Sequence, residues 1–482
     1  MTARTRPRLQ ILGCAVLVVL LAACAVNPVS GRKELSFFSE AQEIALGEQT
    51  DREIRSQFGV YDDPKLNAYF ASVGAALAPY THRPHLTYHF AVLDTPVVNA
   101  FAVPGGYIYI TRGALAMMIS EAEMATVLGH ELGHVNARHS IRKLSGMILV
   151  QAGLAVGSAL SETFAKVAGV AGIGVQLLFL KYSRDDEREA DALGVDYARR
   201  GGYNPAEMVG FFGSLEKLGD LSGNRHALPG FLSTHPLTKE RIKNVQAMIE
   251  EDDARLPINQ DAYLRRIDNM IYGEDPRQGY VENAVFYHPD LRFQVAIPQG
   301  WTVQNTPSRV AMVSKDENAA LLLQLEKTGL AVEEYAGKKA EEIEGRKLIR
   351  EEGPRSISGL TFIHRTYDVP QGEQEALRVR LSFVRKKDFI YTFSALSSVS
   401  GFPKYEGTFQ SAVASFRELT DRRYIDRQPI RIRLVTADGK TPLNAIFAAA
   451  GMPEDVRPKF AVVNAYDLKD TPKRGQIIKV AR

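Results

Sequence analysis

The stretch of this sequence with the clearest chemistry is GHELGHVNARHS, residues 129–140, in which two histidines stand four residues apart and a glutamate follows the first. Residues four apart in a helix share a face, so His130 and His134 can direct imidazole nitrogens at one ion. This geometry fits catalytic zinc, which has three protein ligands and an open water position. The motif predicts hydrolysis of a peptide carbonyl, with Glu131 as the general base that takes a proton from water.

A third histidine, His139, does not complete the ligand set in the way that metzincins do. Their HExxHxxGxxH pattern has a glycine that turns the chain, whereas this sequence has Ala137 at that place and Ser140 where the last histidine would stand. We therefore interpret His139 as a supporting or structural residue.

The stretch SRDDEREAD, residues 183–191, offers a better third ligand. In a helix Glu187 and Asp191 share a face, whereas Glu189 points about 200° away from Glu187. A glutamate ligand with an aspartate one turn later resembles the gluzincin arrangement, in which the aspartate steadies a zinc-bound histidine, here expected to be His130. An acidic, solvated helix face is the competing interpretation.

Capping signals indicate where the helices around these motifs begin. Ser39 to Gln42 and Ser120 to Glu123 each have the spacing of a capping box, and Asp63-Pro64 is a typical start for a third helix. The helix that opens at Ser120 carries the histidine motif and is expected to run to about Lys143.

Three strands are expected before the motif: one from Thr87, and a pair in NAFAVPGGYIYIT, residues 99–111, that is broken at Pro104-Gly105-Gly106. If the strand that begins at Asn99, Ala100 and Phe101 is a sheet edge beside the metal, an extended peptide can pair with its backbone. Ordinary sheet packing is the competing interpretation for Phe101.

The N-terminus has the layout of a secretory signal, with Arg4, Arg6 and Arg8 before an apolar run that is too short to span a membrane. LAAC, ending at Cys24, resembles a bacterial lipobox and predicts lipidation of that cysteine after removal of residues 1–23, with the outer membrane favoured. Without the three arginines, basic and acidic residues balance, so nucleic acid is excluded as a partner.

The apolar residues 146–180 have two interpretations: a membrane hairpin, or a buried or mobile segment near the site. Polar residues and glycines interrupt the run, so we favour the second.

Composition and pattern predict an α+β chain of several domains. The expected parts are a mainly helical zincin-type domain over 24–255, a linker over 256–288, a small PsbP-like α+β domain over 289–420, and a module over 428–482 that runs strand, helix, helix, strand. The last module resembles a degenerate LysM module, which implies binding to glycan such as peptidoglycan; a terminal structural cap is the alternative.

Three ordered motifs, NAFAVPGG, GHELGHVNARHS and SRDDEREAD, resemble metallopeptidase family 48, the group that includes HtpX and the CAAX prenyl proteases. The resemblance covers roughly residues 35–250 and implies one zinc ion on His130, His134 and Glu187. It also suggests that a loop with His235 and Arg241 approaches the metal. His235 would fill the open position at rest or stabilise the oxyanion, and a turn histidine without metal contact is the alternative.

These observations lead to a functional hypothesis: a periplasmic zinc endopeptidase, anchored to the outer membrane through Cys24, that degrades unfolded or misassembled envelope proteins. A chaperone or assembly scaffold for outer-membrane proteins, with little proteolytic use, is the alternative function.

Overall fold

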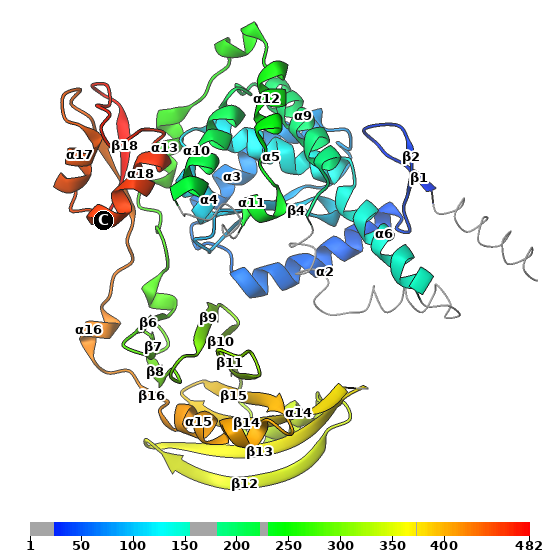
Figure 1. Ribbon diagram of the computed structural model, residues 1–482, viewed down its shortest axis with the longest axis vertical. Coiled ribbons are helices and arrows are strands. Elements are labelled where there is room, and N and C mark those ends of the chain that lie inside the picture. Colours follow the sequence, from blue (N-terminus) through cyan, green and yellow to red (C-terminus); the bar gives the residue numbers. More distant parts are fainter. Residues whose placement is uncertain (1–23, 155–180, 222–229, 373) are drawn as a thin grey trace, which may run out of the picture. The chain divides into compact units, whose positions relative to one another are not determined.

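The computed structural model describes residues 24–154, 181–221, 230–372 and 374–482 (Figure 1). Helices and strands are mixed, which confirms the α+β class. The chain divides into two compact units. Unit 1 comprises the N-terminal part as far as Gly273 together with Ile430–Arg482, and unit 2 comprises Glu274–Pro429.

Unit 1 begins with a short strand pair and two helices whose starts match the capping signals. Ser39 caps the first of these helices with a reciprocal bond to Gln42, and Asp63 caps the second, which has proline in its first turn. The elements are β1 (Cys24–Val26), β2 (Lys33–Leu35), α2 (Glu40–Phe58) and α3 (Pro64–Leu77).

A three-stranded sheet in the order β3-β5-β4 lies beside these helices. Its strands are β3 (His89–Leu93), β4 (Ala100–Val103) and β5 (Tyr107–Thr111), and the expected break falls at η2 (Pro104–Gly106). β5 pairs with β3 in parallel and with β4 antiparallel. Among the described strands β4 has a neighbour on one side only, so it is an edge of this sheet.

The histidine motif lies on α5 (Glu121–Asn136), a buried helix among α3, α9 and α10 (Figure 1). Ser120 caps it, but the Glu123 carboxylate accepts from the backbone of Ile119 instead of closing a capping box. The helix was expected to reach Lys143 and ends earlier. Arg138 has a φ of +54° and bonds through its guanidinium to Glu43, so the chain turns before α6 (His139–Leu154) begins.

The acidic motif opens α9 (Arg184–Arg200), with Ser183 as its cap in a reciprocal bond with Asp186. This helix crosses α5 at small residues. A Cβ atom on Gly129 would lie 2.9 Å from the carbonyl oxygen of Gly194, so neither position has room for a side chain. The close crossing brings the acidic side chains of α9 against the histidines of α5.

The remaining elements of the N-terminal part cover this pair of helices. They are η1 (Ala78–Tyr80), α4 (Arg112–Met117), α10 (Glu207–Leu221), α11 (Phe231–Thr234), α12 (Lys239–Met248), η3 (Glu251–Arg255) and α13 (Gln260–Ile267).

Ile430–Arg482 returns to the same hydrophobic core. Its elements run strand, helix, helix, strand as expected: β17 (Ile432–Thr436), α17 (Leu443–Ala449), α18 (Arg457–Val463, after η5 at Glu454–Val456) and β18 (Ile477–Ala481), with β17 and β18 paired antiparallel. Phe447, Phe460 and Val480 are buried in one cluster with Met124 and Leu128 of α5. This segment is therefore packed into the unit that carries the motif.

Unit 2 is built on a seven-stranded antiparallel sheet in the order β12-β13-β14-β15-β11-β10-β9 and a smaller sheet in the order β16-β8-β7-β6. Helices accompany these two sheets, as expected for an α+β domain. The elements are η4 (Pro276–Gln278), β6 (Tyr280–Glu282), β7 (Val285–His288), β8 (Phe293–Ala296), β9 (Thr302–Thr306), β10 (Arg309–Val313), β11 (Ala319–Lys327), α14 (Val332–Glu341), β12 (Lys347–Ile357), β13 (Leu360–Gln371), β14 (Gln374–Lys386), β15 (Phe389–Ser398), α15 (Phe402–Ala414), β16 (Arg417–Glu418) and α16 (Arg422–Ile425).

Within the part of the chain that the structure describes, no helix combines the length and apolar character that a membrane span requires. Most of the apolar stretch 146–180 lies outside the described residues.

Candidate metal centre

Four buried side chains from three separate elements converge at one point in unit 1. His130 and His134 come from α5, Glu187 from the first turn of α9, and His235 from the residue after α11, and one ligand atom of each lies within 4.8 Å of the others. The Nε2 atoms of His130 and His134 are 3.0 Å apart. Glu187 Oε1 is 3.6 Å from Nε2 of His134 and 2.9 Å from Nδ1 of His235.

The donor set fits a zinc ion. Zinc–nitrogen bonds of about 2.0–2.1 Å at tetrahedral angles place two nitrogens about 3.3 Å apart. The separations are close to this value, at 3.0 Å between His130 and His134 and 3.3 Å between His130 Nε2 and His235 Nδ1. Two imidazoles and a carboxylate are a common zinc set, so His130, His134 and Glu187 can hold the ion.

Asp191 fixes the ring of His130 from behind. Its Oδ1 lies 3.0 Å from His130 Nδ1, which leaves Nε2 free to face the centre. Arg241 bonds to both oxygens of Asp191, at 2.7 and 2.6 Å, and reaches Glu187 Oε2 at 2.7 Å. Burial alone would raise the pKa of Asp191. The bonds to Arg241 and His130 lower this pKa by more than burial raises it, so it lies below its usual value. Arg241 thus forms ion pairs with Glu187, a candidate ligand, and with Asp191, which orients His130.

His139 supports His134 in the corresponding way. Its Nδ1 lies 2.8 Å from His134 Nδ1, and its Nε2 lies 3.0 Å from Glu189 Oε2. Because the carboxylate can only accept, His139 donates from Nε2 and accepts at Nδ1 from His134. This tautomer leaves Nε2 of His134 free to face the centre. Glu189, which points away from Glu187 on α9, therefore belongs to the support of the site.

Glu131 lies next to the four converging groups. It is buried, and among the described residues its carboxylate makes no hydrogen bond to another side chain. Its Oε1 lies 3.7 Å from His235 Nε2. Burial raises the pKa of Glu131, which makes this carboxylate a stronger base than one in water. These properties suit a general base.

The centre is closed by aromatic rings. His235 is 1% exposed and stacks on Phe231 of α11, with centroids 4.7 Å apart. On the other side Tyr182 stacks on His134 at 3.9 Å, and its hydroxyl meets Ser140. We did not predict Tyr182 from the sequence. The only signal is its place directly before the Ser183 cap of α9.

The residues expected to bind a peptide lie at the start of the edge strand β4. Asn99 is half-buried, and Ala100 pairs with Ile110 of β5. Phe101 is 6% exposed and packs on Tyr109 with centroids 5.1 Å apart. The Phe101 side chain is therefore occupied by sheet packing, and the outer backbone edge of β4 faces none of the described strands.

Residues 64–249, which include every residue of the centre, match the sequence profile of the family described as Peptidase family M48. These residues are an M48 peptidase domain. The M48 domain confirms the resemblance of the three ordered motifs, whereas no comparison shows a LysM module.

The relatives of this M48 domain are bacterial and mitochondrial proteases. The chain is 30% identical over 236 residues to the beta-barrel assembly-enhancing protease of Yersinia pestis, covering 47% of this chain and 48% of that protein. It is 33% identical over 204 residues to the mitochondrial metalloendopeptidase OMA1 of Arabidopsis thaliana, covering 42% and 40%. The chain thus spans about half the length of the curated relatives it matches.

Among solved structures, cyanobacterial PsbP from Synechocystis shows 15% identity and a TM-score of 0.25, covering 29% of this chain and 96% of that one. This score is too low to assign a shared fold.

Proposed function

We propose that this protein is a zinc-dependent endopeptidase of the bacterial cell envelope that degrades unfolded or misassembled proteins. The observation that carries the proposal is the convergence of His130, His134 and Glu187 beside the buried base Glu131. The M48 profile and the protease names of the relatives support it.

Each residue has one task in this proposal. His130, His134 and Glu187 hold the zinc ion, which when bound supplies a Lewis acid and lowers the pKa of a bound water to about 7. Glu131 takes a proton from the attacking water at its carboxylate and delivers it to the leaving nitrogen. Asp191 and His139 keep the two imidazoles oriented.

His235 closes the centre in the resting enzyme. Its Nδ1 lies with the ligand atoms of His130 and Glu187, where it competes with substrate for the open position. Peptide access then requires that the His235 ring moves, so the enzyme is gated. This geometry favours the resting-state role of His235 over that of an oxyanion donor.

The substrate is an extended polypeptide that pairs with the outer backbone edge of β4. Backbone pairing is tolerant of sequence and requires an unfolded segment, which suits the removal of misassembled chains. The nearness of β4 to α5 supports this placement.

The lipobox-like LAAC supports a periplasmic enzyme that is anchored to the outer membrane by a lipidated Cys24. Relatives named beta-barrel assembly-enhancing proteases support envelope proteins as clients. The strand, helix, helix, strand order of 430–482 is compatible with a LysM-like module, for which peptidoglycan would be a further partner. Binding of purified protein to cell-wall sacculi tests this last point.

Digestion of casein by the purified protein, compared with its Glu131→Gln variant, tests the proposed activity. Loss of the general base is expected to lower the rate by at least about 10²-fold, with the metal content unchanged. Equal rates would overturn the proposal.

The same variant separates the protease from the scaffold hypothesis, which the protease names of the relatives do not favour. Rescue of an envelope defect by Glu131→Gln would support the scaffold, and failure of rescue supports the protease.

A further inference from the structure

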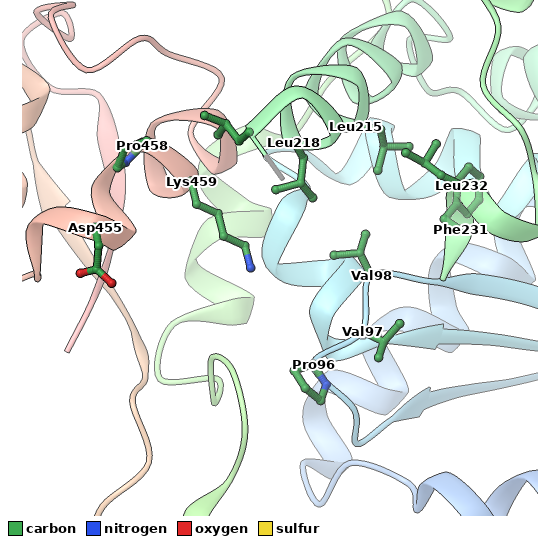
Figure 2. Close-up of a pocket in the computed structure, with 11 residues that line it drawn as sticks. Pro96, Val97, Val98, Leu215, Leu218, Phe231, Leu232, Asp455, Pro458 and Lys459 are labelled. Carbon is green, nitrogen blue, oxygen red and sulfur yellow. The ribbon is translucent and has the colours of Figure 1, made fainter. Parts of the chain in front are cut away.

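An apolar groove of about 580 Å³ lies beside the metal centre within unit 1 (Figure 2). One wall comes from the M48 domain and the other from the C-terminal segment. The lining residues are Pro96, Val97, Val98, Leu215, Leu218, Leu221, Phe231, Leu232, Asp455, Pro458 and Lys459. A cavity of this volume holds one or two large side chains, and its walls are mostly apolar.

The Phe231 ring lies between the groove and the catalytic centre. One face of this ring stacks on His235, and its centroid lies 6.2 Å from that of His130. The backbone amide of Phe231 donates to the carbonyl of Val98 at 2.9 Å. Val98 stands just before β4, so the groove begins next to the strand on which the substrate is proposed to pair.

Among the described residues that line this apolar space, Lys459 is the only cation. Figure 2 shows the Lys459 side chain reaching from α18 toward Val98, whereas Asp455 points away from it. The Lys459 ammonium lies 5.6 Å from the centroid of Tyr272, and no ion pair with a described residue is present. The lysine keeps part of its surface in solvent, and the apolar surroundings lower its pKa by disfavouring the charged form; an anion bound beside the ammonium would offset this effect.

We propose that this groove is a substrate site that takes a bulky apolar side chain and, through Lys459, favours a carboxylate next to it in the substrate. The inference rests on the proposed endopeptidase function and names its preferred substrates: unfolded segments in which a large apolar residue neighbours Asp, Glu or a chain-terminal carboxylate. The C-terminal segment thereby becomes part of the specificity of the enzyme.

Quenched fluorescent peptides that differ only in the residue next to a leucine, Asp or Lys, test this inference. The wild-type enzyme is expected to cleave the Asp peptide with the higher kcat/KM. Lys459→Glu should lower the ratio of the two kcat/KM values by about tenfold, because it replaces an attractive charge by a repulsive one. Lys473→Glu makes the same charge change on an exposed site of the same segment, outside the groove, and should leave the ratio unchanged.

A second variant tests the apolar wall without touching the lysine. Val97 is 37% exposed, so Val97→Trp fills the groove with little effect on the fold. The variant should raise KM for peptides that carry leucine at the position expected to enter the groove. It should leave KM unchanged for peptides with alanine at that position. A wild-type enzyme that cleaves both peptides equally, or ratios untouched by Lys459→Glu, would overturn the inference. Absence of any cleavage by the wild type would instead refute the proposed function.

Discussion

At the residue scale, the two histidines of α5 are oriented by different carboxylates. His130 is held directly by Asp191, and His134 is held through His139 by Glu189. The helical spacing predicted that Glu187 and Asp191 would act together, because four residues bring side chains onto one face. It could not predict the role of Glu189, because that depends on a histidine of another helix. The pairing of Arg241 with Asp191 was also outside the reach of the sequence, since the two residues are fifty positions apart.

Removal of the His235 ring should open the centre. We expect His235→Ala to raise the rate of casein digestion, by about tenfold if the closed form dominates at rest. Zinc content should be retained, because His130, His134 and Glu187 remain. A stopped assay at several casein concentrations measures the effect. A fall in kcat would contradict the gate and support an oxyanion role.

Acidification should weaken unit 2 through a buried histidine. Burial, helped by Arg380, lowers the pKa of His364 to about 4 from 6.5. The folded unit therefore keeps this ring neutral while the unfolded chain gains a proton. The contribution of His364 to the free energy of unfolding is fully present above about pH 6.5. It is lost as the pH falls toward 4, and this loss is on the order of 3 kcal/mol.

Chemical denaturation at pH 7.5 and pH 5 checks this expectation. Trp301, the single tryptophan of the sequence, packs against Tyr405 and Phe409 in unit 2, so its fluorescence reports this unit. His364→Gln should reduce the loss of stability on acidification. Part of the loss of stability should remain in this variant, because burial also lowers the pKa of His288 to about 4. An unchanged pH dependence in the variant would refute the assignment.

At the scale of elements, α5 shows what periodicity can and cannot predict. Its start at Ser120 and the position of the motif follow from local signals. Its end does not, because the turn at Arg138 is stabilised by Glu43 of α2, which is 95 residues away. The sequence pattern after Asn136 is still compatible with a helix, so only the contact between the helices reveals the break.

The start of α5 also depends on the last strand. Lys479 of β18 is fully buried and donates to the carbonyls of Ala116 and Met118, at 2.9 and 2.6 Å. Burial lowers its pKa and raises that of Glu123, whose charge partly offsets the effect on the lysine. The sequence of this strand does not predict a contact with residues 361 and 363 positions earlier.

Lys479→Met should therefore destabilise unit 1. It removes the lysine donor from two buried carbonyls, and each such loss costs about 1–3 kcal/mol, so we expect a decrease of about 2–6 kcal/mol in the free energy of unfolding. Circular dichroism during denaturation measures this, with the exposed Lys473→Met as control. Equal stability of both variants would contradict the role of Lys479.

At the scale of the molecule, unit 2 is inserted between two neighbouring parts of unit 1. Ile271 and Arg431 form an antiparallel bridge, and the amide of Tyr272 donates to the carbonyl of Ile430 at 2.8 Å. The chain therefore leaves and re-enters unit 1 at one place. The sequence predicted the strands and helices on both sides but could not show that the last segment returns to the first core.

This topology predicts that unit 2 can be removed while unit 1 stays folded. Replacement of 274–429 by a short glycine-serine loop should leave casein digestion within about threefold of wild type, since insertions with adjacent ends tolerate excision. Deletion of 430–482 should instead abolish folding, because it exposes the shared core. An inactive protein after replacement of 274–429, together with an active protein after deletion of 430–482, would contradict the insertion of unit 2 into unit 1.

The zinc centre is tested most directly by the metal content of the purified protein, measured by mass spectrometry on the wild type and two variants. We expect one zinc per chain in the wild type, loss of zinc in Glu187→Ala, and retention in His235→Ala. Undiminished zinc in a folded Glu187→Ala variant would contradict the proposed centre.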